Sequence, residues 1–462
     1  MKTRIHFLFT MADLYRRKFP KLPAKFAEFW EKAISEIIGD VCELSFSMAL
    51  TEEEFSKSIK KAEKNDSDLL AVLPVAYAPS AIAKKLVKCR TLFALISSSS
   101  DQELPYSMDG NHLLANQGMH GVIDLANVLW RSGISFPLIC GHPNQESFRR
   151  KLIQLVKCAR AAKVFKSGKA GKIGDSFEGM LDLSFDEKNK SRSLGFETIK
   201  VSPSSIVEKA KSATSREIQK FIKSLNSTFQ VSKDFTEDEL DASARMSIAI
   251  QSAVKEDGLD AIAMNFVALV EKDAPTMPFL GASILLSQGI GYAGESDVLS
   301  AMLSASLAKI SPQATFTELY SPDYGRNELL LSHMGECNFS MAGPGSVLLK
   351  PKPFLWGKCL RPAVPVFQME EGKAIMASIS QTPDEESFQI LCFECEIVKA
   401  PDHPNLTVPY TRIRTSGEVP DFLKEYSRKG GTHHLALAKG ISVDDINTMT
   451  ELLGIEFKTI KS

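Results

Sequence analysis

Histidine is rare in this chain, and two of its eight copies stand side by side. Imidazole side chains bind metal ions and move protons, so the pair is a natural place to look for chemistry. His433 and His434 follow Gly430 and Gly431 in GGTHHLALAKG, which predicts a strand entered through a flexible loop. Successive side chains of a strand face opposite sides, so only one of the pair can face a given site. Taken alone, the pair favours a structural role.

A carboxylate and a third histidine lie in the segment TFTELYSPDYGRNELLLSHMGEC. Glu318 is on one apolar strand and His333 ends the next, with a turn-like stretch at Ser321–Asn327 between them. Such a hairpin brings a carboxylate and an imidazole together at one end of a sheet. An edge-strand glutamate and a core histidine remain the alternative interpretation.

Two glycine-rich runs resemble nucleotide-binding loops only superficially. Gly289, Gly291 and Gly294 spell GxGxxG, but Pro278–Gln288 before them has helical texture and no acidic strand end follows about 20 residues later. We interpret these glycines as a flexible loop that positions Glu295. The run at 168–174 lacks a GK[ST] ending and is interpreted as a linker.

Two other familiar motifs are not supported. Cys392 and Cys395 form a CxxC without a second pair nearby, and the strand around them predicts that they face opposite sides. The order of Gly343, Pro344, Gly345 and Ser346 differs from a GxSxG nucleophile elbow. Neither a zinc ribbon nor a serine hydrolase is predicted.

The elements that must position these residues begin with an α/β pattern. Capping boxes at Thr51/Glu54 and Thr236/Glu239 mark helix starts. Short β-type runs alternate with helical periods, as parallel strands joined by crossover helices do. The predicted strands are Ile5–Phe9, Cys42–Met48, Leu69–Val75, Thr91–Ile96 and Ser135–Cys140.

Three domains are predicted. A Gly/Lys-rich passage at Lys166–Lys172 ends the first α/β domain, residues 1–165. A second α/β domain, 166–312, carries a strand near Glu197–Val201, a long helix from Ser202, a strand at Leu259–Phe266, and Glu295. Residues 313–462 form a mainly β domain with a late helix at Ser442–Leu453, and it carries Glu318, His333 and His434. The fold class is therefore α/β, two domains with parallel sheets followed by a β-rich domain.

The composition of the chain limits the partners and the compartment that can be expected for it. With 55 Lys+Arg against 56 Asp+Glu, no nucleic-acid surface is predicted, and Lys57–Lys64 is interpreted as a solvated helix face. Eight scattered cysteines indicate a reducing compartment without structural disulfides. No apolar run reaches about 18 residues, and the N-terminal run is interpreted as a buried strand rather than a signal peptide. We expect a cytoplasmic protein without membrane contact.

At the residues above, the sequence resembles the L-arabinose isomerase and L-fucose isomerase family, closest to the arabinose side. Four separated matches occur in the family's order. From the N-terminus they are Asn116-Gln117-Gly118-Met119-His120-Gly121; Gly294-Glu295-Ser296-Asp297; Phe316-Thr317-Glu318 with Ser332-His333-Met334, Glu336 and Cys337; and Gly430-Gly431-Thr432-His433-His434.

The resemblance implies a metal-dependent isomerisation of an aldose to a ketose through a cis-enediol. The implied metal ligands are Glu295, Glu318, His333 and His434, and the two glutamates act as acid and base, in an order left open. Asp297, Glu336 and His433 are candidates to orient the ligands, with an ordinary packing role as the alternative. Mixed oxygen and nitrogen donors suit Mn²⁺, and Co²⁺, Ni²⁺ or Zn²⁺ also fit.

The resemblance further implies substrate contacts from Asn116, Gln117 and His120, and a homo-oligomer, trimer or hexamer, with sites between subunits. Phe177 lies where Gly-Asp-Ser-Phe partly matches the family's Gly-Asp-Asn-Met and is assigned to substrate binding. The family's Gln-His-Leu-Tyr-Gly near the first strand is replaced by the segment Met11–Arg16. Two alternatives stay open, a non-catalytic sugar-binding protein on the same fold and a metal-dependent hydrolase.

Overall fold

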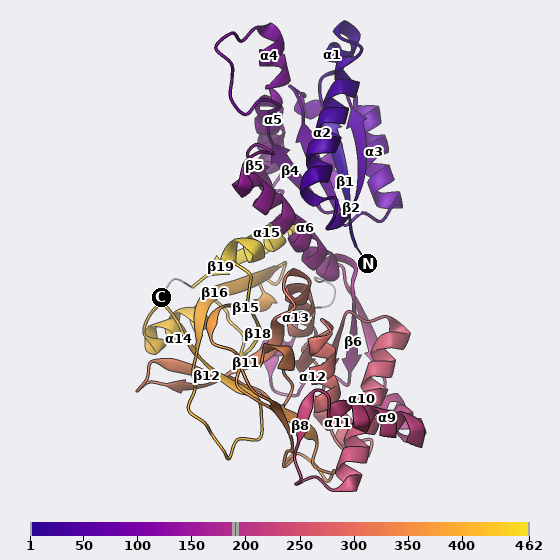
Figure 1. The fold of residues 1–462 in the computed structure, drawn as a ribbon, viewed down its shortest axis with the longest axis vertical. Coiled ribbons are helices and arrows are strands. Elements are labelled where there is room, and N and C mark those ends of the chain that lie inside the picture. The colour runs from indigo at the N-terminus through magenta and orange to yellow at the C-terminus, as the bar shows by residue number, and fades with distance from the viewer. Residues whose placement is uncertain (1, 187–189, 191–193, 461–462) are drawn as a thin grey trace. The chain divides into compact units, whose positions relative to one another are not determined.

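Figure 1 shows the computed structural model of the chain, which describes residues 2–186, 190 and 194–460. It divides into two compact units, Met1–Lys163 with Asp444–Gly454, and Val164–Val443 with Ile455–Ser462. The division into three domains therefore stays a prediction. The late helix, α15 (Val443–Leu453), groups with the first unit, where the carbonyl of Asp445 accepts a contact from Cys158 Sγ at 3.4 Å.

The first unit contains one parallel sheet in the order β2-β1-β3-β4-β5. Every strand predicted for this domain is present. The strands are β1 (Thr3–Thr10), β2 (Cys42–Ala49), β3 (Leu69–Pro74), β4 (Phe93–Ser97) and β5 (Leu138–Cys140). The helical segments are α1 (Asp13–Lys18), α2 (Leu22–Ile38), α3 (Glu52–Lys64), η1 (Ser80–Lys88), α4 (Gly110–Ala115), α5 (Gly118–Arg131) and α6 (Glu146–Ser167).

The second unit begins with a four-stranded parallel sheet, β10-β9-β6-β7. Its strands are β6 (Lys169–Ile173), β7 (Glu197–Val201), β9 (Ala261–Met264) and β10 (Gly291–Gly294). The helical segments are η2 (Leu181–Leu183), α8 (Pro203–Ser212), α9 (Ser215–Leu225), α10 (Glu237–Asp257), α11 (Phe266–Val270), α12 (Phe279–Ser287) and α13 (Val298–Ile310). A small mixed sheet joins β8 (Phe229–Val231), β13 (Val347–Pro351) and β14 (Ala363–Val366).

The rest of the second unit is a closed six-stranded antiparallel barrel, because β15 pairs with both β18 and β16. The barrel strands are β11 (Ala314–Asp323), β12 (Glu328–Ser332), β15 (Gly372–Gln381), β16 (Phe388–Val398), β17 (Tyr410–Arg414) and β18 (His434–Ala438). Helix α14 (Val419–Arg428) and the turn η3 (Phe339–Met341) lie between them in sequence, and β19 (Glu456–Thr459) adds parallel to β16. Two parallel α/β sheets and a β-rich C-terminal part confirm the predicted fold class.

Alternation along the strands decides which side chains lie outside the barrel. Leu329, Leu331, Leu435 and Leu437 belong to the buried core cluster of the barrel. Their sequence neighbours on the same strands, His434 and Ser332 among them, therefore face outward. Helix α13 lies beside β11 and β18 in Figure 1, so this outer face is covered by the central α/β part.

Three local predictions were wrong. The supposed linker at 168–174 contains β6, which pairs on both sides, and the supposed loop before Glu295 contains β10. The long helix from Ser202 is two helices, because Thr214 and Glu217 form a capping box that starts α9. Among the described residues, no helix is both long enough and apolar enough to cross a membrane.

Candidate metal centre

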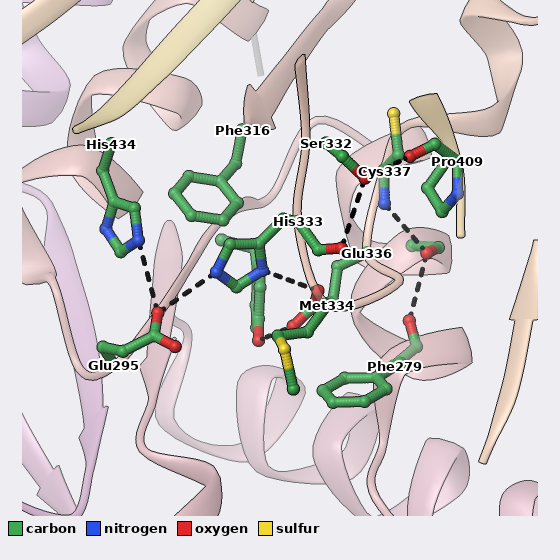
Figure 2. A network of polar contacts seen from close by, with 12 residues as sticks. Phe279, Glu295, Phe316, Ser332, His333, Met334, Glu336, Cys337, Pro409 and His434 are labelled. Carbon is green, nitrogen blue, oxygen red and sulfur yellow. Dashed lines mark hydrogen bonds and ion pairs between the residues drawn. The ribbon is translucent and has the colours of Figure 1, made fainter. Parts of the chain in front are cut away.

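Three side chains from distant parts of the sequence converge in the second unit. Potential ligand atoms of Glu295, His333 and His434 all lie within 4.8 Å of one another, and all three residues are buried. Figure 2 shows both imidazoles directed at the Glu295 carboxylate. The distances to Glu295 Oε2 are 3.2 Å from His333 Nε2 and 3.3 Å from His434 Nε2. The structure thus brings together three of the four predicted ligands.

A sharp turn after β10 presents Glu295. Glu295 and Ser296 have positive φ values of 51° and 59°, a conformation that costs most residues free energy and persists where surrounding contacts enforce it. Ser296 Oγ donates to the carbonyl of Ile173 at 2.7 Å, and Asp297 caps α13 by accepting from the Ser300 N–H at 3.0 Å. These contacts hold the carboxylate at the carboxyl end of a strand, between the central sheet and the barrel.

The barrel supplies the two histidines. His434 opens β18, and His333 directly follows β12. The centroid of the Phe316 ring on β11 lies 4.8 Å from that of each imidazole, in a T-shaped arrangement with both, so this ring packs against the two histidines together. A Cβ on Gly294 would lie 2.5 Å from Cε1 of His333, so only glycine allows the imidazole to approach β10 this closely.

Each imidazole is held through its other nitrogen by a buried carboxylate. His434 Nδ1 lies 3.0 Å from Asp297 Oδ2, and His333 Nδ1 lies 2.9 Å from Glu336 Oε2. Tyr292 in turn donates its hydroxyl hydrogen to Glu336 Oε1 at 2.6 Å. Carboxylates paired with the far nitrogen of a histidine are typical of metal sites, because they fix the tautomer that leaves Nε2 free to bind.

The charges at this centre are tightly coupled. Burial alone would lower the pKa of His333, but the carboxylates of Glu336 and Glu295 raise it well above its usual value. Burial alone would raise the pKa of Glu295, but His333 and His434 hold it well below its usual range. Three buried carboxylates, Glu295, Asp297 and Glu336, thus face two imidazoles.

A divalent cation fits this donor set. With neutral imidazoles, the three carboxylates leave an excess of negative charge in a buried place, which is costly without a cation. Two imidazole nitrogens and a carboxylate oxygen already converge on one point, and no thiolate is among them. Such a mixed nitrogen and oxygen set suits Mn²⁺ and neighbouring transition metals.

Comparison with known families agrees with the resemblance seen in the sequence. Residues 174–313 match the model of the L-arabinose isomerase central domain, and residues 313–456 match that of the L-arabinose isomerase C-terminal domain. The chain belongs to the L-arabinose isomerase family. The matched residues include every ligand of the candidate centre, so the family assignment and the geometry concern the same part of the molecule.

Individual relatives in this family are distant. The L-arabinose isomerase of Erwinia tasmaniensis is 25% identical over 398 residues, which covers 82% of this chain and 76% of the relative. That of Nocardioides sp. is 22% identical, covering 78% and 74%. Among solved structures, an ABC transporter solute-binding protein from Burkholderia multivorans matches 67% of this chain and 96% of its own at 13% identity, with a TM-score of only 0.18.

Glu318, the fourth predicted ligand, lies beside the group rather than in it. It pairs in register with His434 on one side and with Ser332 on the other, so all three side chains share the outer face of the barrel. Its side chain is half-buried, and its carboxylate is not among the converging ligand atoms. Directly opposed residues in such pairs have Cβ atoms about 5 Å apart, so Glu318 stands within reach of the centre.

Two of the three residues predicted to orient the ligands contact them, and the third does not. Asp297 and Glu336 contact the two histidines as described, whereas His433 points elsewhere. Its Nδ1 lies 2.6 Å from Asp182 Oδ2, and its backbone N–H donates to the same oxygen at 3.4 Å.

Of the predicted substrate residues, Phe177 lies next to the centre, and its N–H donates to the carbonyl of Glu295 at 3.1 Å. The other three lie in the first unit. Asn116 donates to Asp101 at 2.7 Å, Gln117 accepts from the Tyr15 hydroxyl at 3.2 Å, and the His120 ring lies 4.9 Å from that of Tyr77.

Sequence reasoning missed Tyr292, Phe316 and Asp182. Two of these could have been found from the sequence. Phe316 stands two residues before Glu318, and Tyr292 stands two residues before Gly294, so in a strand each lies on the same face as that residue. Asp182 carried no such signal, because its partner His433 is 251 positions away.

Proposed function

We propose that this protein is a metal-dependent aldose–ketose isomerase. The observation that carries the proposal is the convergence of two imidazole Nε2 atoms on the Glu295 carboxylate, with each Nδ1 held by another buried carboxylate. Membership of the L-arabinose isomerase family supports it.

The metal is proposed to be Mn²⁺, held by Glu295, His333 and His434. Glu318, which is paired with His434 in the sheet, is proposed as the fourth ligand. When bound, such a cation supplies positive charge beside the sugar oxygens on which negative charge develops. Asp297 and Glu336 keep both imidazoles in the tautomer that directs a lone pair at this position.

The proton chemistry is assigned to the glutamates. Isomerisation removes the proton from C2 of the aldose and adds a proton to C1, while the O2 hydroxyl gives up its proton and O1 gains one. The sugar passes through a cis-enediol between these steps. A positioned carboxylate contributes roughly 10²- to 10⁴-fold to such a transfer. The half-buried Glu318 is the better placed to meet a carbon-bound proton, because Glu295 is engaged by both imidazoles.

The substrate is proposed to be a free aldose, with L-arabinose the first to test because the relatives carry that name. Phe177 is proposed to contact the sugar beside Glu295. Asn116, Gln117 and His120 are proposed to contact the sugar from a second copy of the chain.

An unusual surface supports a homo-oligomer. Seven large apolar side chains within residues 104–130 are exposed, and Trp130 remains 75% accessible. They are Leu104, Tyr106, Met108, Leu113, Met119, Ile123 and Trp130. Large apolar side chains exposed in such number along one segment are typical of a surface that packs against another chain. His120 lies on the same helix, α5, so an assembly through this surface would bury it near a partner.

The test is incubation of the protein with Mn²⁺ and a panel of aldoses, with and without a chelator, while ketose is measured. The proposal expects ketose formation that the chelator abolishes and that excess Mn²⁺ restores. Bound metal without ketose from any sugar would contradict it and favour a sugar-binding protein, and release of a cleaved product would favour a hydrolase.

A further inference from the structure

A segment of the second unit crosses from the central sheet to the barrel beside the metal centre. We call residues Gly174–Asp186 the strap. It leaves the carboxyl end of β6, where Ser296 Oγ and Asn265 Nδ2 donate to the carbonyls of Gly174 and Asp175. Its far end places the Phe185 ring 6.1 Å from that of Phe388 in the barrel. The strap therefore connects the two parts of the unit that supply the candidate metal ligands.

Two contacts attach the strap directly to ligand-bearing segments. At one, the Phe177 N–H donates to the carbonyl of Glu295 itself. At the other, the Asp182 carboxylate pairs with His433, the residue before His434, at 2.6 Å. The imidazoles of His433 and His434 are 4.3 Å apart, so the Asp182 contact lies one side chain away from a ligand.

Between these contacts the strap is loosely packed. Leu181 is 81% exposed, and Gly179 has a φ of 89° with open space where a side chain would be. Glu178 is also exposed. Few buried contacts hold this stretch, and the Asp182–His433 pair is the first contact that attaches it to the barrel, before Phe185 and Asp186 reach Phe388 and Gln381.

The three ligands are buried, and the strap is attached both to Glu295 and to the residue before His434. We propose that Asp182 is a positioning residue: its ion pair with His433 latches the strap beside the metal centre and controls how fast a bound cation escapes. The inference rests on the metal binding of the proposed function. It gives a role at the metal centre to Asp182, which belongs to none of the sequence motifs and is not a ligand.

The first experiment measures release of Co²⁺, whose visible absorption reports its ligands. The Co²⁺-loaded protein is mixed with excess chelator, and the loss of absorption is followed. Asp182→Asn should release the cation about tenfold faster, as expected from losing one half-exposed charged hydrogen bond. The matched control is Glu178→Gln, which removes the same charge from the same strap and should release Co²⁺ at the wild-type rate.

A double-mutant cycle identifies the partner. His433→Gln should match Asp182→Asn, and the double variant should release Co²⁺ no faster than either single variant, because both remove the same contact. Wild-type release from Asp182→Asn, or equal acceleration by Glu178→Gln, would overturn the latch.

Chymotrypsin cleavage within Phe177–Phe185 of the metal-free protein gives a second readout that needs no cation. Cleavage in Asp182→Asn should be several-fold faster than in the wild type, and equal cleavage would overturn the latch. If the wild type takes up no Co²⁺ but the variant is cleaved faster, the attachment of the strap through Asp182 stands, whereas the proposed function and the control of cation release both fail.

Discussion

Glu336 has no place among the ligands, yet it contacts a ligand on one side and Tyr292 on the other. Replacing it with glutamine removes the charge that holds Nδ1 of His333 and lowers the basicity of that imidazole. We expect Glu336→Gln to weaken Mn²⁺ binding by about 10- to 100-fold in a calorimetric titration. Tyr292→Phe keeps the carboxylate–histidine contact and should lose less. Equal affinity for wild type and Glu336→Gln would show that the pair is merely structural.

Glu318 is the residue on which the proposed proton transfer depends. Glu318→Gln keeps the shape of the side chain but cannot accept a proton, so ketose formation should fall at least about 10²-fold while the circular dichroism spectrum is unchanged. Mn²⁺ binding should weaken as well. Glu394→Gln is the control, because Glu394 is an exposed glutamate elsewhere on the barrel. Wild-type turnover in Glu318→Gln would remove the glutamate from the mechanism.

For single residues, the sequence predicted the candidate metal ligands better than the residues that contact them. Glu295, His333 and His434 were identified through short motifs and do converge, because each motif sits at the end of a strand. The side on which His433 lies followed from strand alternation, but its partner Asp182 did not. A contact between a loop and a strand 251 positions apart leaves no local pattern.

At the scale of elements, the centre depends on how closely β10 approaches the barrel. Gly294→Ala places a methyl group 2.5 Å from an imidazole carbon, and the buried ring has little space to retreat. We expect Mn²⁺ affinity to fall at least about tenfold, with a destabilisation of roughly 1–3 kcal/mol. The control is Gly325→Ala in the β11–β12 turn, where the nearest atom would be 3.6 Å away. Both effects are measured by calorimetric titration and urea unfolding, and unchanged affinity in Gly294→Ala would contradict the close contact.

The strands that position the site were the hardest to predict. β6 reads KAGKI and β10 reads GYAG, which lack the run of β-branched and aromatic residues that marks β1 or β16. Their glycines are required by packing instead. A Cβ on Gly291 would meet the Ala301 carbonyl of α13 at 2.0 Å, and one on Gly171 would meet Leu259 at 2.5 Å. Close packing against neighbouring elements therefore requires glycine in β6 and β10, and these glycines give the two strands a composition typical of loops.

For the whole molecule, acid sensitivity should begin in the first unit. His6 is buried between Ser45 Oγ at 2.7 Å and Ser47 Oγ at 2.8 Å, and burial, assisted by Lys61, lowers its pKa from 6.5 to about 4. Between these values the unfolded chain binds the proton and the folded chain does not. The stability from this group is thus complete above about pH 6.5 and is lost as the pH falls toward 4.

The expected loss is about 2 kcal/mol, measured as the free energy of unfolding in urea at pH 8 and pH 5. In His6→Gln the difference between the two pH values should shrink by most of that amount. His112→Gln is the control, because His112 is partly exposed on α4. The same pH dependence in His6→Gln as in the wild type would contradict the assignment.

Assembly is the other property of the whole molecule that can be tested. Ile123→Glu puts a charge into the exposed apolar surface of α5 and should reduce the mass measured by light scattering, with loss of turnover. Mn²⁺ binding should persist, because the ligands lie in the other unit. Val41→Glu, a comparably exposed apolar position in the same unit, is the control. A wild type that is monomeric and active would exclude sites shared between copies.

The path of the chain between the two units also bears on how the protein is made. Helix α15 buries Ile446, Met449 and Leu453, and it belongs to the unit that the chain began to build more than 400 residues earlier. On the ribosome, the first strand of the N-terminal sheet must therefore wait until more than 400 further residues have been made before this helix emerges. β19 follows α15 immediately and pairs with β16 in the second unit, so the two units gain these elements one directly after the other. A nascent chain stalled shortly before residue 443 would expose incomplete cores in both units, a state that chaperones recognise.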